Sequence, residues 1–283
     1  MLRIVRVFVY LILALLLSIY ALEFYVDRQL SSKDFSSAYN DCRKVWTARG
    51  LYGEGIDQNS IQSIGRAFQQ GAQGVEVDVR YDVAQKDYIV SHDYPYRTKN
   101  GKILPLSELF NAVGDGHYFW LDFKALRHLS DEQAMEAVQR LKDISSRNGL
   151  SDRIYVEGEN PTNLAHFRKA GFHTIFDTHP EPESVFVSGL MIAVYKIFYY
   201  FGDHTVMGME YGELNDPVYG DKTRRQLGNI PVFLYHLPAD ETLVDSLLPV
   251  PQVRAFIVGN NLSIDLHHKD NCGSDRSRVN TAR

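Results

Sequence analysis

The sequence predicts an α/β fold, a (β/α)8 TIM barrel preceded by one N-terminal transmembrane helix. From residue 44 to residue 258, short apolar runs typical of strands alternate with stretches that have the one-sided apolar spacing of helices. About eight strand-like runs in roughly 220 residues, separated mostly by helices, favour a closed parallel barrel. An open doubly wound sheet is the alternative, although the glycine-rich turn of dinucleotide-binding folds is not found after the first strand.

The individual elements follow from apolar periodicity. In the helix expected at 59–70, for example, Ile61, Ile64 and Phe68 are three or four residues apart and therefore share one face. Further helices are expected at 106–113, 131–148 and 161–170, and strands at 44–49, 74–81, 88–91, 118–123, 153–157, 173–177, 205–210, 232–235 and 255–258.

The N-terminal segment is long and apolar enough to cross a membrane. Residues 7–26 carry a single charge, Glu23, and a span needs about 20 residues. Arg3 and Arg6 precede the segment and Asp27 follows it. The positive-inside rule then predicts a single-pass cell-membrane protein with a cytoplasmic N-terminus and the barrel on the periplasmic or extracytoplasmic side.

A cleaved signal peptide is the alternative interpretation of this segment. Cleavage after Ala21 would leave the bulky Ile19 where a small residue is expected, which favours the uncleaved anchor. Both interpretations export the barrel. The predicted organisation is an anchor at 1–27, a linker at 28–43, the barrel at 44–268 and a polar tail at 269–283.

Composition and cysteine content narrow the function classes. With 30 basic and 35 acidic residues the net charge is −5, so the chain lacks the basic field that attracts nucleic acid. Cys42 and Cys272 lie near the two ends of the barrel segment. In an oxidising compartment they either form a disulfide that joins these ends or remain two unrelated thiols.

Two carboxylates on one strand are the first sign of chemistry. In the run at 74–79, side chains alternate between faces, so Glu76 and Asp78 share one face and three valines share the other. If the valines pack against helices, both carboxylates point toward the barrel axis, where unpaired like charges are costly. Either a metal ion or a basic side chain such as Lys124 or Arg49 would compensate these negative charges.

The following strands favour a metal. Asp122 and Lys124 are two residues apart and share a face, and His92 ends a strand-like run that places it at the same rim. Three carboxylates with water suit Mg²⁺ or Ca²⁺. Lysine beside them suits a phosphate oxygen, and a histidine at this position suits a general acid or base.

From Trp46 to about Lys124 the sequence resembles the glycerophosphodiester phosphodiesterase family and its superfamily, which includes phosphatidylinositol-specific phospholipase C and sphingomyelinase D. The matching pieces are Ala48-Arg49-Gly50 for His-Arg-Gly, Gln58-Asn59-Ser60 for Glu-Asn-Thr, the stretch 71–79 for Gly-Ala-Asp-x-(Ile/Leu)-Glu-x-Asp-Val, His92-Asp93 for His-Asp, Leu106-Ser107-Glu108-Leu109 for the following helix, and Asp122-x-Lys124 for Glu-x-Lys.

This resemblance implies a metal-dependent barrel that cleaves phosphodiesters, with a glycerophosphodiester or phospholipid as substrate. Two histidines would act as acid and base on opposite sides of phosphorus. The implied ligands are Glu76, Asp78 and Asp122, the implied phosphate-binding and catalytic residues are Arg49 and Lys124, and the implied catalytic histidine is His92.

The departures from the family pattern concern proton transfer and substrate contacts. Ala48 stands where the family has its first catalytic histidine, and Asp122 replaces the third glutamate, as in the sphingomyelinase D branch. Tyr235-His236-Leu237-Pro238 stands where the family often has Trp-Thr-x-Asn, and Gly259-Asn260-Asn261-Leu262 where it has Thr-Asp-x-Pro. Tyr235 and His236 are therefore expected on the substrate side of an unusual pocket.

Two functions remain open. In the first, the protein is an active phosphodiesterase in which His236 replaces the missing histidine. In the second, it is a catalytically inactive exported barrel that binds a phosphorylated or lipid ligand. A glycosidase is disfavoured, because Glu76 and Asp78 sit on one strand and cannot flank a substrate.

A second apolar stretch, Val185 to Phe201, contains Lys196 as its only charge. It is either a barrel helix buried between the sheet and a neighbour or an interfacial segment whose aromatic end lies at a membrane surface. The interfacial alternative implies a phospholipid or lysophospholipid substrate.

Overall fold

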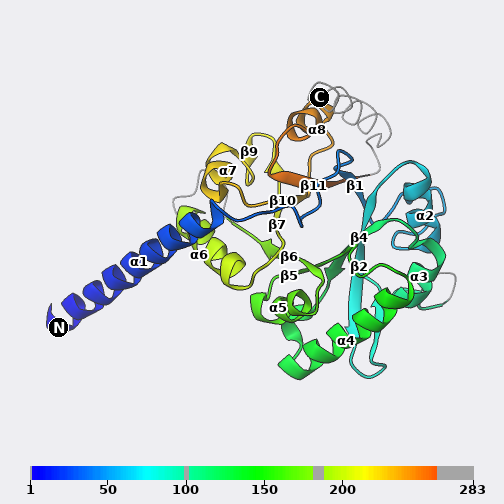
Figure 1. Ribbon diagram of the computed structural model, residues 1–283, viewed down its shortest axis with the longest axis horizontal. Helices are drawn as coiled ribbons and strands as arrows, with labels where there is room; N and C mark the ends of the chain where they lie inside the picture. Colours follow the sequence, from blue (N-terminus) through cyan, green and yellow to red (C-terminus); the bar gives the residue numbers. More distant parts are fainter. Residues whose placement is uncertain (1, 99–101, 181–187, 260–283) are drawn as a thin grey trace, which may run out of the picture.

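In the computed structural model, which describes residues 2–98, 102–180 and 188–259, eight parallel strands form a closed barrel surrounded by helices (Figure 1). The barrel closes because β1 pairs with both β2 and β11, which rules out the open sheet. The barrel strands are β1 (Val45–Ala48), β2 (Gly74–Asp82), β4 (Tyr118–Phe123), β5 (Ile154–Gly158), β6 (His173–Thr178), β7 (Val206–Glu210), β10 (Val232–Tyr235) and β11 (Val253–Val258).

The predicted alternation of strands and helices is confirmed. The helices around the barrel are α2 (Ile61–Gln69), α3 (Leu106–Val113), α4 (Asp131–Arg147), α5 (Pro161–Lys169), α6 (Ser188–Phe201), α7 (Asp221–Leu227) and α8 (Glu241–Leu247), with a short 3-10 helix, η1 (Leu126–His128). The expected run at 88–91 forms β3 (Asp87–Val90), which pairs antiparallel with β2 outside the barrel. A small hairpin, β8 (Gly212–Glu213) and β9 (Asp216–Pro217), follows β7.

The barrel interior has two chemically different levels. Towards the amino-terminal ends of the strands it is filled by large apolar side chains that pack together, namely Trp46, Trp120, Tyr155, Ile175, Val206, Phe233 and Ala255. Further along the same inward rows, towards the carboxyl ends, stand Glu76, Asp122, Glu157 and Asp177. The aromatic level fills the barrel at this end, and a polar cavity opens at the carboxyl-end mouth.

The segment before β1 covers the amino-terminal end of the barrel. Ala38 and Tyr39 are buried, and the Tyr39 backbone N–H donates to the Tyr155 hydroxyl at 2.7 Å. The Tyr39 ring also packs edge-on against Trp46, with centroids 5.0 Å apart. The stretch expected as a linker therefore contributes to the core.

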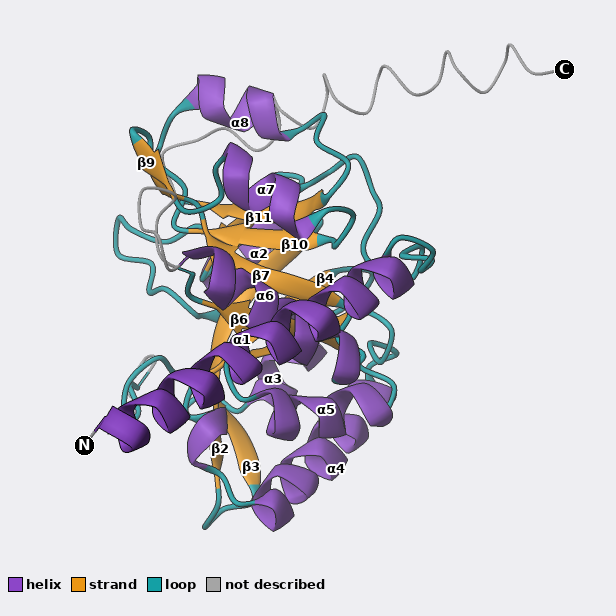
Figure 2. Cartoon of the chain, turned by 90° about the vertical axis from the view of Figure 1, so that its left-hand side faces the viewer, coloured by secondary structure: helices purple, strands orange, loops and turns teal. Residues whose placement is uncertain are grey.

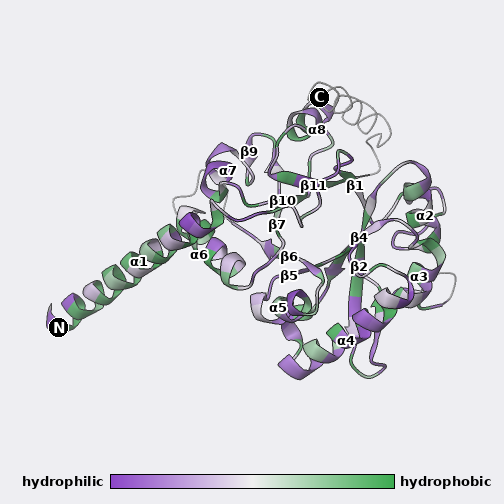
Figure 3. Cartoon of the chain, in the orientation of Figure 1, coloured by the Kyte–Doolittle hydropathy of each residue, from purple (hydrophilic) through white to green (hydrophobic). Residues whose placement is uncertain are grey.

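A long apolar helix, α1 (Leu2–Leu30), projects from the barrel and is exposed along most of its length (Figures 1 and 3). By length and composition it is able to cross a membrane. Its last turns pack against α6. The barrel-helix interpretation of the second apolar stretch is therefore correct for Ser188–Phe201, and α1 is the neighbour of that helix.

Some expectations fall outside the described residues. Cys272 lies there, so the choice between a Cys42–Cys272 bridge and two separate thiols does too. The same holds for the polar tail at 269–283 and for most of the stretch Gly259-Asn260-Asn261-Leu262.

The packing around two glycines predicts different effects on stability when each is replaced by alanine. A Cβ at Gly74 would lie 2.4 Å from the Trp46 ring, whereas one at Gly65 in α2 would lie 3.6 Å from Val113. We expect Gly74→Ala to lower the free energy of unfolding by about 1–3 kcal/mol through overpacking. Gly65→Ala should be neutral or raise it by up to about 1 kcal/mol, because alanine favours helix. Urea unfolding of both variants checks this, and equal effects would contradict the packing described.

Candidate active site

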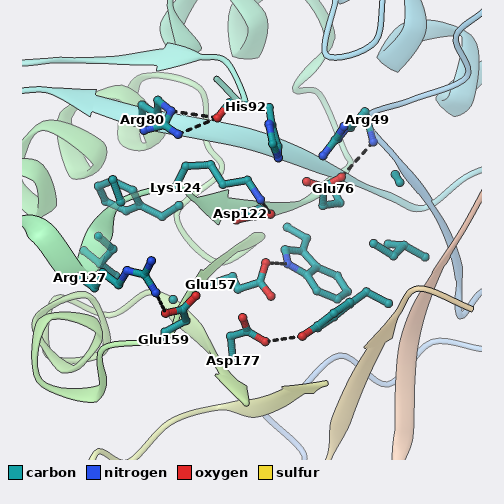
Figure 4. A pocket seen from close by; sticks show the side chains of 18 of the residues that line it. Arg49, Glu76, Arg80, His92, Asp122, Lys124, Arg127, Glu157, Glu159 and Asp177 are labelled. Carbon is teal, nitrogen blue, oxygen red and sulfur yellow. Dashed lines mark hydrogen bonds and ion pairs between the residues drawn. The ribbon is translucent and has the colours of Figure 1, made fainter. Parts of the chain in front are cut away.

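A cavity of about 710 Å³ opens at the carboxyl ends of the strands (Figure 4). It is lined by residues from the loops after most barrel strands, as expected for the functional end of such a barrel. Of the residues selected from the sequence, those that line it are Arg49, Glu76, His92, Asp122, Lys124, Tyr235 and His236, together with Ala48. Asp78 lies beneath them, fully buried.

The three predicted carboxylates converge. Glu76 and Asp78 lie on β2, and the register of β2 with β4 places Asp122 directly beside Asp78. An oxygen from each of the three lies within 4.8 Å of the others. Glu76, Asp78 and Asp122 therefore form a group that could hold a metal ion.

Asp78 is the most constrained member of this group. Its Oδ2 lies 2.8 Å from Arg49 Nε and accepts from Asn59 Nδ2 at 2.6 Å, while the Asp78 backbone N–H donates to Asn59 Oδ1 at 3.1 Å. Its Oδ1 is buried 3.2 Å from Lys124 Nζ but accepts no hydrogen bond in the described part of the chain. Such a buried oxygen has coordinating capacity to spare.

The charges of the group explain why a cation fits. Burial raises the pKa of Glu76 well above its usual range, and the neighbouring Asp78 and Asp122 raise it further. Burial also raises the pKa of Asp122 to about 6, although Lys124 opposes the shift. When all three carboxylates are ionised, their negative charge exceeds the positive charge of Arg49 and Lys124. An oxygen-only donor set with excess negative charge matches the preference of Mg²⁺ and Ca²⁺.

The turn after β1 places Arg49 over this group. Gly50 has φ +78°, and a Cβ there would lie 2.5 Å from the backbone carbon of Ser63, so only glycine fits. The Ser63 hydroxyl donates to the Arg49 carbonyl at 3.0 Å, and the Arg49 backbone N–H donates to Glu76 Oε2 at 3.1 Å. Ala48, just before this turn, is the register neighbour of Glu76. The position without a histidine therefore adjoins the carboxylate group directly.

His92 is held at the rim from two sides. Its Nδ1 lies 2.6 Å from Asp93 Oδ1, and Arg80 donates to its backbone carbonyl at 2.8 and 3.0 Å. Figure 4 shows the His92 side chain beside that of Arg49, with Asp122 below both in the view. With Nδ1 engaged by Asp93, Nε2 is the atom able to exchange a proton with a ligand.

A second set of polar residues was missed by the sequence analysis. Buried Glu157 accepts from Trp120 Nε1 at 2.7 Å, and burial raises its pKa well above the usual range. Asp177 accepts from the Tyr235 hydroxyl at 2.9 Å and lies 3.1 Å from His179 Nε2. Strand alternation could have found both acids, because each lies two residues after an inward-facing core residue.

His236 reaches the cavity because β10 ends at Tyr235. Its φ of 49° turns the chain away from the strand, so His236 and Tyr235 both line the pocket. The side chain is 76% exposed, and Nδ1 lies 3.4 Å from Glu210 Oε2. By contrast, the His179 side chain is 57% exposed, and its hydrogen bond with Asp177 raises its pKa above the usual range.

Glu159, Asp177 and His179 form another cluster with ligand-type atoms close together. Like the first group, it already has ion-pair partners, since Glu159 lies 2.5 Å from Arg127 Nη1 and Asp177 pairs with His179. It is, however, more exposed than the first group. The Glu76–Asp78–Asp122 group is therefore the stronger candidate for metal.

Comparison of sequences finds no matching family model and no matching curated protein. Comparison of structures does find similar folds. A glycerophosphodiester phosphodiesterase from Parabacteroides distasonis matches with a TM-score of 0.56 and 16% identity, over 82% of this chain and 98% of that one. The chain shares the fold of these phosphodiesterases.

Two further structures agree. An Oleispira antarctica phosphodiesterase, solved in complex with the product sn-glycerol-3-phosphate, gives a TM-score of 0.58 at 14% identity, over 80% of this chain and 96% of that one. A glycerophosphodiester phosphodiesterase from Agrobacterium tumefaciens gives 0.51 at 13% identity, over 80% and 99%. At such low identity these similarities establish the barrel, and the residues of the site must carry the function.

The carboxylate group predicts a specific metal response. The wild type should bind Mg²⁺ or Ca²⁺, and Asp78→Asn should weaken binding by at least about tenfold, since it removes a buried ligand oxygen. Glu159→Gln, in the second cluster, is the matched control and should bind as the wild type does. Isothermal titration calorimetry after chelation measures all three. Weaker binding in Glu159→Gln with Asp78→Asn unaffected would move the metal to the other cluster.

Proposed function

We propose that the protein is a metal-dependent phosphoric diester hydrolase that acts on a glycerophosphodiester or phospholipid-type substrate. The observation that carries the proposal is the convergence of Glu76, Asp78 and Asp122 with two cations and His92 at the mouth of the barrel. The fold shared with glycerophosphodiester phosphodiesterases supports it.

In this proposal Glu76, Asp78 and Asp122 hold Mg²⁺ or Ca²⁺. When bound, the cation supplies neutralisation of the charge that develops on the phosphoryl oxygens. Arg49 and Lys124 then bind the phosphate. Both line the cavity and remain partly exposed, and burial lowers the Lys124 pKa less than the Asp122 and Asp78 carboxylates raise it, so it stays charged.

Cleavage needs two proton transfers. One group takes the proton from the oxygen that attacks phosphorus, and another gives a proton to the ester oxygen that leaves as the P–O bond breaks. His92 is suited to one transfer through Nε2. Ala48 cannot perform the other, so a second residue must.

Two histidines are candidates for the second transfer. His236 is the one expected from the sequence, and Tyr235 and His236 together would also contact the substrate. The Asp177 contact favours His179, because a carboxylate that raises the pKa of a histidine keeps it protonated and able to donate near neutral pH. Tyr235 is close to both histidines, since it directly precedes His236 in the chain and its hydroxyl lies 3.3 Å from His179 Nδ1.

We further propose that α1 anchors the protein in the cell membrane as a single pass, with a cytoplasmic N-terminus and the barrel on the periplasmic or extracytoplasmic side. Its length, its apolar composition and its exposed surface support a membrane-spanning role. Arg3 and Arg6 at its start support the orientation.

A catalytically inactive barrel that binds a phosphorylated or lipid ligand is the second candidate. Ala48 is the observation that favours it, because one of the two proton-transfer positions carries a methyl group. Retention of the buried carboxylates argues against it, because they are costly to keep in a barrel that has lost its chemistry.

Hydrolysis of bis(p-nitrophenyl) phosphate with Mg²⁺ or Ca²⁺ separates these candidates. We expect cation-dependent turnover that His92→Ala lowers by about 10²–10⁴-fold, the usual effect of losing an acid–base group. His166→Ala is the control, since His166 lies on α5 and pairs with Asp131 outside the cavity. Equal background rates in the wild type and His92→Ala would leave only the binding function.

The pH profile distinguishes His179 from His236. A general acid must be protonated, so the rate should fall as pH rises through its pKa. The hydrogen bond with Asp177 raises the His179 pKa, which places this alkaline limb above about 6.5. His179→Gln should lower the rate and abolish the limb, whereas His236→Gln should keep it. The opposite pattern would assign the transfer to His236.

A further inference from the structure

The barrel is attached to α1 by a packed junction. The less exposed positions of α1 are Leu16, Ile19, Glu23, Val26 and Leu30, which recur three or four residues apart and so form one helix face. Val26 is fully buried and Leu30 nearly so. This face packs against α6.

A buried charge fixes the junction. The Lys196 side chain is 2% exposed, its Nζ lies 3.2 Å from Glu23 Oε1, and it also pairs with Asp27. A buried ammonium group is unfavourable without partners of opposite charge, and both partners here come from α1. The two helices therefore hold one relative position.

The direction of α1 follows from its pairings with α6. Because α6 follows β6, it runs from the mouth of the barrel towards the opposite end, where β7 begins. Glu23 meets Lys196, and further along α1 the Tyr25 ring packs edge-on against Tyr200 at 6.1 Å. Beyond the helix, Lys33 lies 2.8 Å from Asp203. Both helices thus run in the same sense, and the N-terminal part of α1 projects on the mouth side.

Figure 2 shows the same arrangement. The N-terminus of α1 and the hairpin strand β9 lie on the same side of the molecule, at the left of the view. The hairpin follows the carboxyl end of β7 and so marks the mouth. A membrane that holds α1 is therefore on the side where the cavity opens.

The length of α1 brings that membrane close. A span of about 20 residues that begins at Ile4 ends at Glu23. Glu23 already pairs with Lys196, which lies in the C-terminal half of α6, away from the mouth. The mouth end of α6 must then lie at the level of the lipid headgroups, because the chain has no spacer between the apolar span and the junction.

The rim of the mouth carries side chains suited to that environment. Tyr94, two residues beyond His92, is 75% exposed, and Leu214 in the β8–β9 hairpin is 49% exposed. Tyr52, which lines the cavity, is also exposed. Tyrosine and leucine are common where proteins meet the interface of a bilayer.

We propose that this rim, marked by Tyr52, Tyr94 and Leu214, faces the headgroup layer of the bilayer in which α1 is embedded. The partner of the surface is that lipid layer. This inference rests on the proposed membrane-spanning role of α1. It rests on the proposed hydrolase function only for its consequence, which is that the cavity receives the phosphodiester headgroup of a lipid from its own membrane.

An alternative contact surface provides the control. Phe198 and Phe201 are also exposed, but they lie at the end of α6 away from the mouth. If the rim faces the bilayer, these two side chains point to water. The rim and the far end of α6 can be compared within one protein.

The test reconstitutes the full chain in phosphatidylcholine vesicles whose acyl chains carry bromine near the headgroup end. Native Trp46 and Trp120 are fully buried and give a constant background. Tryptophan emission is measured in Tyr94→Trp, Leu214→Trp and Phe201→Trp, all at exposed positions. Bromine should quench the added emission of the two rim variants and spare that of Phe201→Trp.

Two outcomes overturn the inference. One is quenching of Phe201→Trp equal to or above that of the rim variants, which would place the far end of α6 against the membrane. The other is no quenching at the rim, which would hold the barrel away from the lipid. The measurement does not depend on turnover, so an inactive protein with a quenched rim would reject the proposed function and keep the orientation.

Discussion

The arrangement of the site depends on one electrostatic constraint, the burial of Asp78 between Glu76 and Asp122. Like charges at this depth are unfavourable unless cations compensate them. Arg49, Asn59 and Lys124 all converge on Asp78, and each comes from a different loop or strand end. The need to compensate this carboxylate therefore ties the turn after β1, the start of α2 and the end of β4 into one unit.

The same constraint gives a physical meaning to the missing histidine. Ala48 adjoins Glu76 in the sheet, so its position belongs to the carboxylate unit. Because alanine has no titratable atom, this position cannot transfer a proton. The balance of charges within the carboxylate unit does not depend on it. The other side of the cavity, with Asp177, Tyr235 and His179, has its own hydrogen-bond network. Under the proposed function, this network would supply the second proton transfer while Arg49 and Lys124 bind the phosphate.

Much of this could be predicted from the sequence. Alternation in β2 placed Glu76 and Asp78 on one face, and the spacing of Asp122 and Lys124 placed them on another inward row. The same rule holds for Glu157 and Asp177, which lie two residues after the inward-facing Tyr155 and Ile175. The α1–α6 junction was beyond local patterns, because Glu23 and Lys196 are 173 residues apart and only the folded chain brings them together. The lone charge of Lys196 in an apolar helix was the one local sign of it.

The most direct measurement is the anomalous scattering of crystals soaked in Mn²⁺, which takes the same oxygen ligands as Mg²⁺. The account predicts a peak bounded by the carboxylates of Glu76, Asp78 and Asp122, within about 2.0–2.6 Å of their oxygens. A peak at Glu159, Asp177 and His179 alone, or none at either cluster, would contradict it.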